Sequence, residues 1–400
     1  MKSKIDNFYR LKLKNGLIIL FEKRSLPIVS ISASVKYGSS YEQEKQKGIS
    51  HFIEHLMFKG TKTRTHKQIA GEIEKKGGIL NGFTSEEVTS YWSKLPSKHI
   101  NSGINITSDL ILNPRFDPKE FEKEKNVIIE EIKMYHDNPI FYVNDKIKEL
   151  LYEKPFGMSI AGKEEIIRKL KLQDVKNLFD SVYTTDSMIL TTVGNADFEE
   201  ICKEAEKFPV KKRKLIEYKP IKRNFELVEE RKGLEQAHFV FSFHSPTMKD
   251  KKRYNYEIAG SYLFGGMSSV LFQEIREKRG LAYSVKGNFE LGSNYGYTNI
   301  YVGTLKEKIK EIKEIILKEI KNLNKLEKKD FEELKEQLIG AKKIEEEDST
   351  NTMNLLMLEE SAGNASEYYK YKDRILKVKL DEVKELSKLK NYSTFSLIPN

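Results

Sequence analysis

The chain has 400 residues, of which 38% are hydrophobic, so it can bury a large core and is long enough for two domains. Its apolar runs are far shorter than the roughly 18 residues that a membrane-spanning helix needs, which predicts a protein without a membrane segment. The single cysteine, Cys202, excludes an internal disulfide and a multi-thiolate metal site, and it favours a reducing, cytoplasmic location.

Charge is high but mixed along the chain. The formal net charge of +10 at pH 7 arises from 70 basic and 60 acidic residues. Lysine and glutamate alternate on predicted helices such as residues 305–338, a pattern typical of a solvated, ion-paired helix surface. Because no nucleic-acid recognition motif accompanies this charge, we predict that the chain does not bind nucleic acid.

Predicted strands and helices follow the same order in both halves of the chain. The first half opens with strand-like segments at residues 16–23 and 29–38, continues with helical patterns, and closes with a strand at residues 188–194. The second half opens with a strand at residues 237–244 and closes with one at residues 393–399. This order predicts an α+β fold in which helices cover one face of a mainly antiparallel sheet.

Three sequence blocks recur in order, which indicates an internal duplication. The matching blocks are MFKG (57–60) and LFGG (263–266), EIEKKGG (72–78) and EIREKRG (274–280), and FEKEKNVIIEE (121–131) and FEELKEQLIGA (331–341). Their separations, 206, 202 and 210 residues, differ by only a few residues. We therefore predict two homologous domains, residues 1–207 and 223–400, joined by a proline-flanked basic linker at residues 208–222.

The first copy carries polar residues that the second copy lacks. The corresponding pairs are His51 and Glu257, Glu54 and Gly260, His55 and Ser261, Glu124 and Leu334, and Glu131 and Ala341. Residues shared by both copies serve the fold, so imidazoles and carboxylates found in one copy alone indicate a functional site in that copy.

The segment GISHFIEHLMFKG, residues 48–60, has the spacing of a metal-binding helix. At about 100° per residue, His51, Glu54 and His55 lie on one helical face, with the two imidazoles one turn apart. On a second predicted helix, Glu124 and Glu131 share an apolar stripe, where a carboxylate needs a cation or strong donors. We predict that His51, His55 and Glu131 bind one metal ion and that Glu124 orients a ligand histidine.

A structural interpretation of the same residues stays open at this point. His51 and His55 are then hydrogen-bonded helix residues, and Glu54 lies at an exposed edge. An H-x-x-E-H pattern arises by chance in roughly one chain in a hundred. The accompanying carboxylates, and their absence from the second copy, favour the metal site.

These residues resemble the inverted-zincin metallopeptidases, the family of pitrilysin, insulin-degrading enzyme and the mitochondrial processing peptidase. HFIEH with Glu131 in EKEKNVIIEEI carries the resemblance, and VKYGSSYE, LNGFTSEEVTSYW, MSIAGKEEI and LFQEIREKRGLAYSV extend it over nearly the whole chain. The resemblance implies a zinc-dependent endopeptidase with one zinc ion per chain. It assigns the zinc ligands to His51, His55 and Glu131, the general base to Glu54, and a supporting role to Glu124.

The resemblance also assigns substrate-contacting residues. Arg276 and Tyr283 are similar to a family pair that contacts the substrate and the oxyanion, although both types also occur as ordinary surface and core-edge residues. The strand of Asn81, Gly82, Phe83 and Thr84 matches the family's active-site strand, whose edge is expected to pair with an extended peptide. Alanine is usual at the position of Gly82, and an ordinary structural strand is the alternative.

Family members of this length resemble one half of a four-domain clamshell, which implies that two chains close around a chamber. We therefore expect a homodimer in which Arg276 and Tyr283 act in trans, with peptides or unfolded protein segments as substrates. Two other functions are kept as hypotheses. One is a non-catalytic scaffold or partner subunit of a processing-peptidase-like complex, and the other is a zinc-binding module without hydrolysis.

Overall fold

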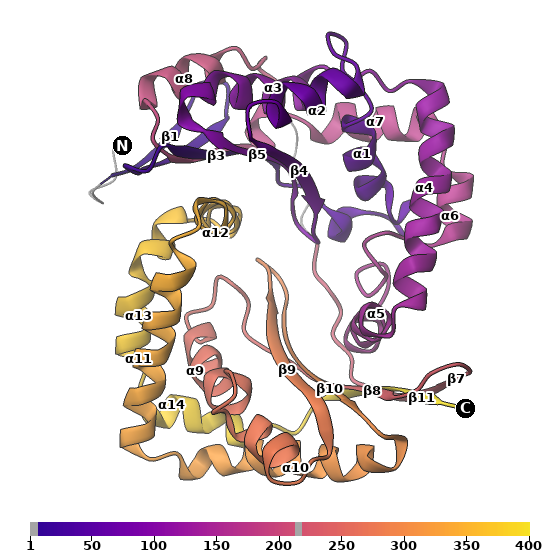
Figure 1. Cartoon of the computed structure of the whole chain (residues 1–400), viewed down its shortest axis with the longest axis vertical. Helices are drawn as coiled ribbons and strands as arrows, with labels where there is room; N and C mark the ends of the chain where they lie inside the picture. The colour runs from indigo at the N-terminus through magenta and orange to yellow at the C-terminus, as the bar shows by residue number, and fades with distance from the viewer. Residues whose placement is uncertain (1–6, 213–217) are drawn as a thin grey trace. The chain divides into compact units, whose positions relative to one another are not determined.

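In a computed structural model, which describes residues 7–212 and 218–400, the chain folds into two compact units (Figure 1). Unit 1 comprises residues 1–133, 159–218 and 345–369, and unit 2 comprises residues 134–158, 219–344 and 370–400. Each unit thus includes a segment from the other half of the chain. Part of the predicted linker, residues 213–217, lies outside the described residues.

Unit 1 contains, within its described residues, a six-stranded sheet in the order β1-β2-β6-β3-β5-β4. Strand β2 runs parallel to β6, and the other neighbouring strands are antiparallel. Strand β4 pairs with β5 alone and so forms one edge of the sheet. The strands are β1 (Phe8–Lys12), β2 (Ile18–Lys23), β3 (Ile28–Val35), β4 (Ile79–Thr84), β5 (Thr89–Pro96) and β6 (Met188–Gly194).

The two faces of this sheet follow from alternation along its strands. In β3, Val29, Ile31, Ala33 and Val35 point into the main core, while the intervening serines point to the opposite face. Most helices of unit 1 cover the apolar face, and Figure 1 shows α3 and α8 on that side. They are α1 (Ile49–Met57), α2 (His66–Glu74), α3 (Ile100–Leu112), α4 (Pro118–Asp137), α6 (Glu164–Lys169), α7 (Leu172–Val182) and α8 (Phe198–Glu206).

Unit 2 contains, in the part of the chain that the structure describes, a five-stranded sheet in the order β7-β11-β8-β10-β9. Strand β7 runs parallel to β11, and the other neighbours are antiparallel. Its strands are β7 (Glu226–Arg231), β8 (Ala237–His244), β9 (Ala282–Leu291), β10 (Gly296–Thr304) and β11 (Ser393–Pro399). Its helices include α9 (Arg253–Phe264), a π-helical segment (Phe272–Glu277), α10 (Ile309–Asn322), α11 (Lys328–Glu345), α13 (Tyr371–Lys377) and α14 (Leu380–Lys384).

The two sheets have the same order once β1 is set aside, which agrees with the duplication. β2-β6-β3-β5-β4 corresponds to β7-β11-β8-β10-β9, including the single parallel pair. The matched sequence blocks also coincide structurally, because Phe121 and Phe331 are both buried and each lies under a lysine ammonium, Lys125 or Lys335, at 4.7 and 4.1 Å. The residues common to both copies therefore build the fold.

One helix in each unit comes from the other half of the chain. Helix α12 (Ser349–Ser361) packs Met353, Leu356 and Met357 against Leu20 and other apolar residues of the unit 1 sheet, on the face opposite α3. In unit 2, α5 (Pro139–Leu151) packs against β8 and β11 and buries Val143, Ile147 and Leu151. The two helices start 210 residues apart and have equal length, so they are the same element of the repeat, exchanged between the copies.

The predicted α+β class with mainly antiparallel sheets is confirmed, and α5 and α12 add a helix on the second face of each sheet. A division of the chain at one linker assigns both helices to the half in which they occur in sequence, whereas the compact units contain them in exchanged positions. Helical periodicity shows that a helix has an apolar face, but it does not show which sheet that face covers.

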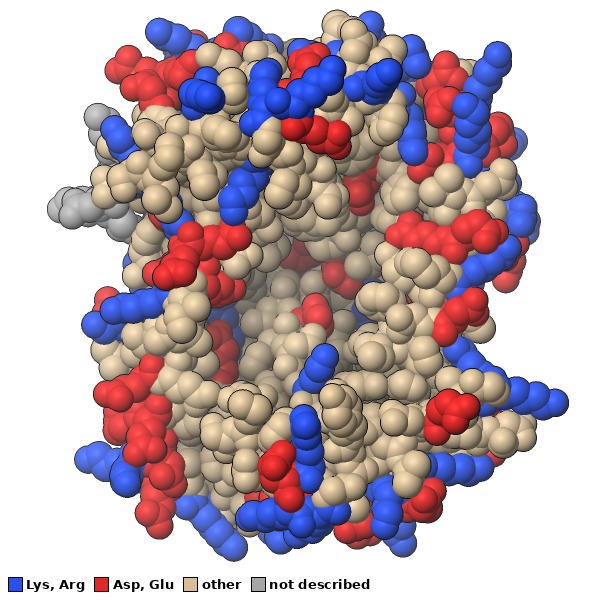
Figure 2. All heavy atoms as spheres, in the orientation of Figure 1, with Lys and Arg blue, Asp and Glu red and all other residues tan. Residues whose placement is uncertain are grey.

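The surface carries the mixed charge that the sequence predicts. Figure 2 shows lysine and arginine interspersed with aspartate and glutamate on the face that it draws. Many of these side chains form i,i+3 or i,i+4 ion pairs, such as Lys133 with Glu130 and Arg168 with Glu164. Among the described residues, we find no helix long and apolar enough to cross a membrane.

Candidate metal centre

Helix α1 has an apolar face and a polar face. Phe52, Ile53, Leu56 and Met57 are at most 2% exposed, and the ring of Phe52 lies 4.9 Å from that of Phe121 on α4. His51, Glu54 and His55 occupy the other face, as the predicted helical spacing requires. Packing of the apolar face thus fixes the direction in which the three polar side chains point.

His51, His55 and Glu131 meet where α1 and α4 lie together. His51 Nε2 lies 3.7 Å from Glu131 Oε1, and His55 Nε2 lies 3.3 Å from Glu131 Oε2. One ligand atom from each residue lies within 4.8 Å of the others. Tetrahedral zinc with bonds of about 2 Å places its ligand atoms about 3.3 Å apart. The donor set therefore fits zinc with only small side-chain movements.

Glu124 lies behind His55 on the same face of α4. The Nδ1–H of His55 donates to Glu124 Oε1 over 2.9 Å, and Glu124 itself is 2% exposed. A carboxylate at Nδ1 fixes the tautomer in which Nε2 carries the lone pair and points it toward Glu131. This is the orienting contact that the sequence predicts for Glu124.

The two histidines differ in their affinity for a proton. Burial, assisted by the neighbouring His55, lowers the pKa of His51 to about 4, so His51 is neutral. Burial also acts to lower the pKa of His55, but hydrogen bonds with Glu124 and Glu131 outweigh it and raise the pKa to about 9. The carboxylates that favour a proton on His55 equally favour a divalent cation between the three side chains.

Glu54 lies on the same face of α1, between the two histidines in sequence. Its Oε2 accepts a hydrogen bond from Thr84 Oγ1 over 2.8 Å, and the residue is 8% exposed. Burial raises the pKa of Glu54, although the Thr84 hydroxyl and the charge of His55 oppose the rise. A carboxylate with a raised pKa beside three potential metal ligands is suited to act as a general base.

Comparisons with known proteins agree with this geometry. Residues 17–164 match the family model described as Insulinase (Peptidase family M16), and residues 169–338 match the one described as Peptidase M16 inactive domain. The chain belongs to peptidase family M16. The resemblance read from HFIEH and Glu131 is thereby confirmed.

Relatives of this M16 chain include named zinc proteases. An uncharacterised zinc protease of Rickettsia felis is 34% identical over 368 residues, which cover 90% of this chain and 86% of that protein. The uncharacterised zinc protease YmxG of Bacillus subtilis is 32% identical over 353 residues, which cover 86% of each chain. The crystal structure of a Helicobacter pylori protease has the same fold, with a TM-score of 0.90 over 98% of this chain and 99% of that chain, at 20% identity.

The predicted substrate strand of the M16 domain is β4. Thr84 and Gly82 face α1, where Thr84 contacts Glu54 and a Cβ added at Gly82 would lie 3.0 Å from the ring of Phe58. Phe83 packs on the opposite face of the sheet, and Asn81 is exposed. A side chain at position 82 would therefore crowd the ring of Phe58.

Lys59 is a site residue that the sequence reasoning missed. Its Nζ lies 2.8 Å from Glu124 Oε2, so Glu124 contacts both His55 and Lys59. Lys59 follows His55 by four residues in the sequence and lies just beyond the end of α1 at Met57. That i,i+4 spacing is the signal that identifies it.

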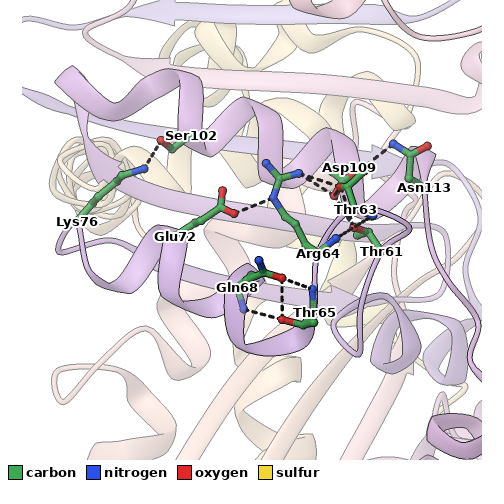
Figure 3. Close-up of polar contacts among 10 residues, drawn as sticks. All are labelled: Thr61, Thr63, Arg64, Thr65, Gln68, Glu72, Lys76, Ser102, Asp109 and Asn113. Atoms are coloured by element: carbon green, nitrogen blue, oxygen red, sulfur yellow. Dashed lines mark hydrogen bonds and ion pairs between the residues drawn. The ribbon is translucent and has the colours of Figure 1, made fainter.

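Beyond α1, a polar network anchors the loop that follows the metal-site helix (Figure 3). Asp109 Oδ2, on α3, accepts hydrogen bonds from Thr61 Oγ1, Thr63 Oγ1 and Arg64 Nη1 at 2.6, 2.9 and 2.8 Å. Arg64 Nε donates to Glu72 on α2. The loop that follows the C-terminal end of α1 is thus hydrogen-bonded to helices α2 and α3.

Arg276 and Tyr283, predicted to contact substrate, lie together in unit 2. The guanidinium carbon of Arg276 is 5.0 Å from the centre of the Tyr283 ring, and Tyr283 is 78% exposed. Arg276 belongs to the π-helical segment, and Tyr283 lies in β9, the edge strand. This exposed cation–aromatic pair can contact another molecule directly.

The second copy has a cavity where the first has the metal cluster. Four positions that correspond to the first-copy site line a cavity of about 460 Å³: Glu257, Gly260, Ser261 and Ala341. Ser261 Oγ donates to Gln337, which in turn donates to the carbonyl of Gly265. Across the described parts of the chain, a group of three potential metal ligands occurs only at His51, His55 and Glu131. Residues 219–338 of unit 2 lie within the segment that matches the model of the M16 inactive domain.

Proposed function

We propose that this chain is a zinc-dependent endopeptidase that hydrolyses peptides or unfolded protein segments, with one zinc ion per chain. The observation that carries the proposal is the position of Glu54. This buried carboxylate with a raised pKa shares the helical face of His51 and His55, next to Glu131. The single, partly buried Cys202 needs no oxidising compartment, which supports the cytoplasm as the location.

The side chains have separate roles in the proposed reaction. A zinc ion held by His51, His55 and Glu131 supplies Lewis acidity, which lowers the pKa of a water molecule and polarises a carbonyl group. Glu54 takes the proton of the attacking water and delivers it to the amine nitrogen as the carbon–nitrogen bond breaks. The water oxygen stays on the acyl carbon, so the products are a carboxylate and an amine. The free edge of β4 offers main-chain hydrogen bonds to an extended substrate.

Metal analysis combined with digestion of an unfolded peptide tests the proposal. We expect one zinc ion per chain and cleavage that a chelator abolishes. Glu54→Gln should keep the zinc and lose cleavage, whereas Glu131→Gln should lose the zinc. Glu130→Gln is the matched control, because Glu130 is the neighbouring carboxylate on α4 and its side chain is 71% exposed. Bound zinc without cleavage by the wild type would instead favour the scaffold or the non-hydrolytic zinc module.

We further propose that two chains form a homodimer in which Arg276 and Tyr283 of one chain act on a substrate at the metal centre of the other. The family resemblance supports this arrangement, as does the exposure of Tyr283 beside Arg276. Mixing an inactive Glu54→Gln chain with an inactive Tyr283→Phe chain should restore part of the activity. If the mixed dimers form and stay inactive, action in trans is wrong.

A further inference from the structure

A buried carboxylate outside the proposed reaction lies at the start of α1. Glu42 is 3% exposed and follows the short 3-10 turn Ser39–Tyr41. Its side chain turns toward residues six and eight positions later in the chain. A fully buried glutamate is costly to retain, so its contacts carry information about its role.

Glu42 binds the backbone of the first turn of α1. Glu42 Oε2 accepts a hydrogen bond from Gly48 N over 2.9 Å, and Oε1 accepts one from Ser50 N over 2.7 Å. The first N–H groups of a helix have no partner within the helix, and a negative charge there interacts favourably with the helix dipole. Gly48, the N-cap residue, has no side chain to do this. Glu42 therefore supplies the N-terminal cap from a neighbouring loop.

Lys47 and Gly48 hold in place the contact between Glu42 and the first turn of α1, which we call the clamp. Lys47 Nζ is fully buried, lies 3.9 Å from Glu42 Oε2 and donates to the Ser39 carbonyl over 2.6 Å. Gly48 has φ of 98°, and a Cβ there would lie 2.5 Å from the carbonyl oxygen of Ala161. Burial raises the pKa of Glu42, while Lys47 and the N–H donors oppose the rise.

The histidine that follows this clamp depends on the backbone for its position. His51 comes directly after Ser50, and its buried Nδ1 has no hydrogen-bond partner among the described residues. His55, by contrast, is held through its side chain by Glu124. Ligand histidines normally need such an outer partner to be oriented. For His51, the rigid first turn takes that place.

The second copy shows the contrast that this role predicts. Helix α9, which carries none of the metal residues, begins near Asp250, whose Oδ1 accepts from Lys252 N over 2.9 Å. Asp250 is exposed, whereas Glu42 is buried. The first copy thus has a buried carboxylate before its helix, whereas the second has a buried arginine, Arg253, whose Nη1 donates to the carbonyl of Met248 over 2.8 Å.

We propose that Glu42, together with Lys47, is a positioning residue that fixes the first turn of α1 and thereby sets the affinity of His51 for the metal. The inference rests on the proposed zinc site. Without the clamp, the first turn frays and His51 samples positions away from Glu131. Metal affinity then falls even where the rest of unit 1 remains folded.

Three variants separate positioning from general stability. Glu42→Gln replaces one acceptor oxygen by a donor that faces an N–H group, and it removes the negative charge that lies 3.9 Å from the Lys47 ammonium. Glu42→Gln/Lys47→Met removes both charges, and it serves as the second test if the single variant fails to fold. Glu360→Gln is the matched control, because Glu360 is a buried carboxylate of unit 1 that binds Arg10 and the backbone of Ala365, away from α1.

Zinc affinity by competition with a chelating dye, hydrogen exchange of the metal-free protein and thermal unfolding give independent measurements. We expect at least about tenfold weaker zinc binding in both Glu42 variants, a size typical of lost support for a ligand. Amides of residues 48–52 should exchange faster in both, and the double variant should regain much of its Tm. Glu360→Gln should lower Tm and leave zinc affinity unchanged.

The outcomes distinguish this inference from the proposed function. A wild-type protein that binds no zinc overturns both. If the wild type binds zinc and Glu42→Gln binds it equally well, only the positioning role is overturned. The role is also overturned if the double variant recovers wild-type zinc affinity together with its Tm, since the pair then serves stability alone.

Discussion

Glu124 joins two basic side chains through its two oxygens, His55 on α1 at 2.9 Å and Lys59 just beyond α1 at 2.8 Å. Burial acts against its ionised form, but the hydrogen bonds with His55 and Lys59 outweigh burial and keep its pKa below the usual value. Glu124 is therefore ionised at neutral pH. One carboxylate sets the tautomer of a ligand histidine and is itself held in place by a lysine.

We predict that Glu124→Gln weakens zinc binding about ten- to a hundredfold, because His55 loses the acceptor that orients it. Zinc titration of the purified variant measures the effect. Glu122→Gln, at a position on α4 whose side chain is 67% exposed, is the control and should bind zinc like the wild type. Equal affinities for the Glu124 and Glu122 variants would exclude an orienting role.

The sequence identified site residues that share one periodic element and missed those that do not. His51, Glu54 and His55 follow from helical spacing, and Glu124 and Glu131 follow from an apolar stripe interrupted by carboxylates. Glu42 precedes the helix in a loop, where a charged residue usually indicates solvent exposure. Its role depends on a fold of the chain that brings residue 42 to residues 48 and 50, and no local pattern records that contact.

Among the elements, the loop between α1 and α2 is held by Asp109. Burial disfavours the ionised form of Asp109, yet hydrogen bonds from Thr61, Asn113 and Arg64 outweigh it and lower the pKa below the ordinary value. A group whose pKa is lower in the folded state stabilises the protein above its unfolded-state pKa, and this stabilisation is lost as pH falls through the folded-state pKa.

We therefore predict that Asp109→Asn lowers the free energy of unfolding by about 1–3 kcal/mol at neutral pH, since several hydrogen bonds to a charged group are lost. The difference from wild type should be constant above about pH 5 and shrink below the ordinary aspartate pKa of about 4. Urea unfolding across this range measures it. Glu72→Gln, which removes the more exposed partner of Arg64, should have a smaller effect. If the difference in unfolding free energy between the wild type and Asp109→Asn stays the same at low pH, the assignment is contradicted.

Element types were easier to predict than element partners. The strands at residues 188–194, 237–244 and 393–399 have the bounds that alternation predicts. The predicted domain bounds place α5 in the first domain and α12 in the second. The sequence could not correct this, because the apolar face of a helix does not indicate which sheet it covers. The 210-residue separation that relates α4 to α11 also relates α5 to α12, so the equivalence was present in the sequence, but the exchange was not.

For the whole molecule, the exchange predicts that residues 1–222 do not form a stable unit by themselves. Without α12, the face of Ile18, Leu20, Ile189 and Val193 loses the cover of Met353, Leu356 and Met357. Each large apolar side chain left exposed costs about 1.5–3 kcal/mol. Light scattering and circular dichroism of the purified fragment should show aggregation or loss of structure.

A rescued fragment provides the control for this prediction. Residues 1–222 extended by a flexible linker and residues 345–369, with Val143, Ile147 and Leu151 of the uncovered α5 replaced by serine, should be soluble and folded. The same fragment with serine at positions 353, 356 and 357 should behave like the unextended one. A monomeric, cooperatively folded fragment of residues 1–222 would show that α12 is dispensable for unit 1.

The late position of α12 in the chain also has a consequence for biosynthesis. A ribosome finishes every strand of the first sheet by residue 194, yet the helix that covers its second face is made only at residues 349–361. During that interval the apolar second face of the sheet is uncovered in the nascent chain, so a chaperone can bind to it. Premature termination anywhere before α12 therefore leaves the second face of the first sheet without the helix that covers it.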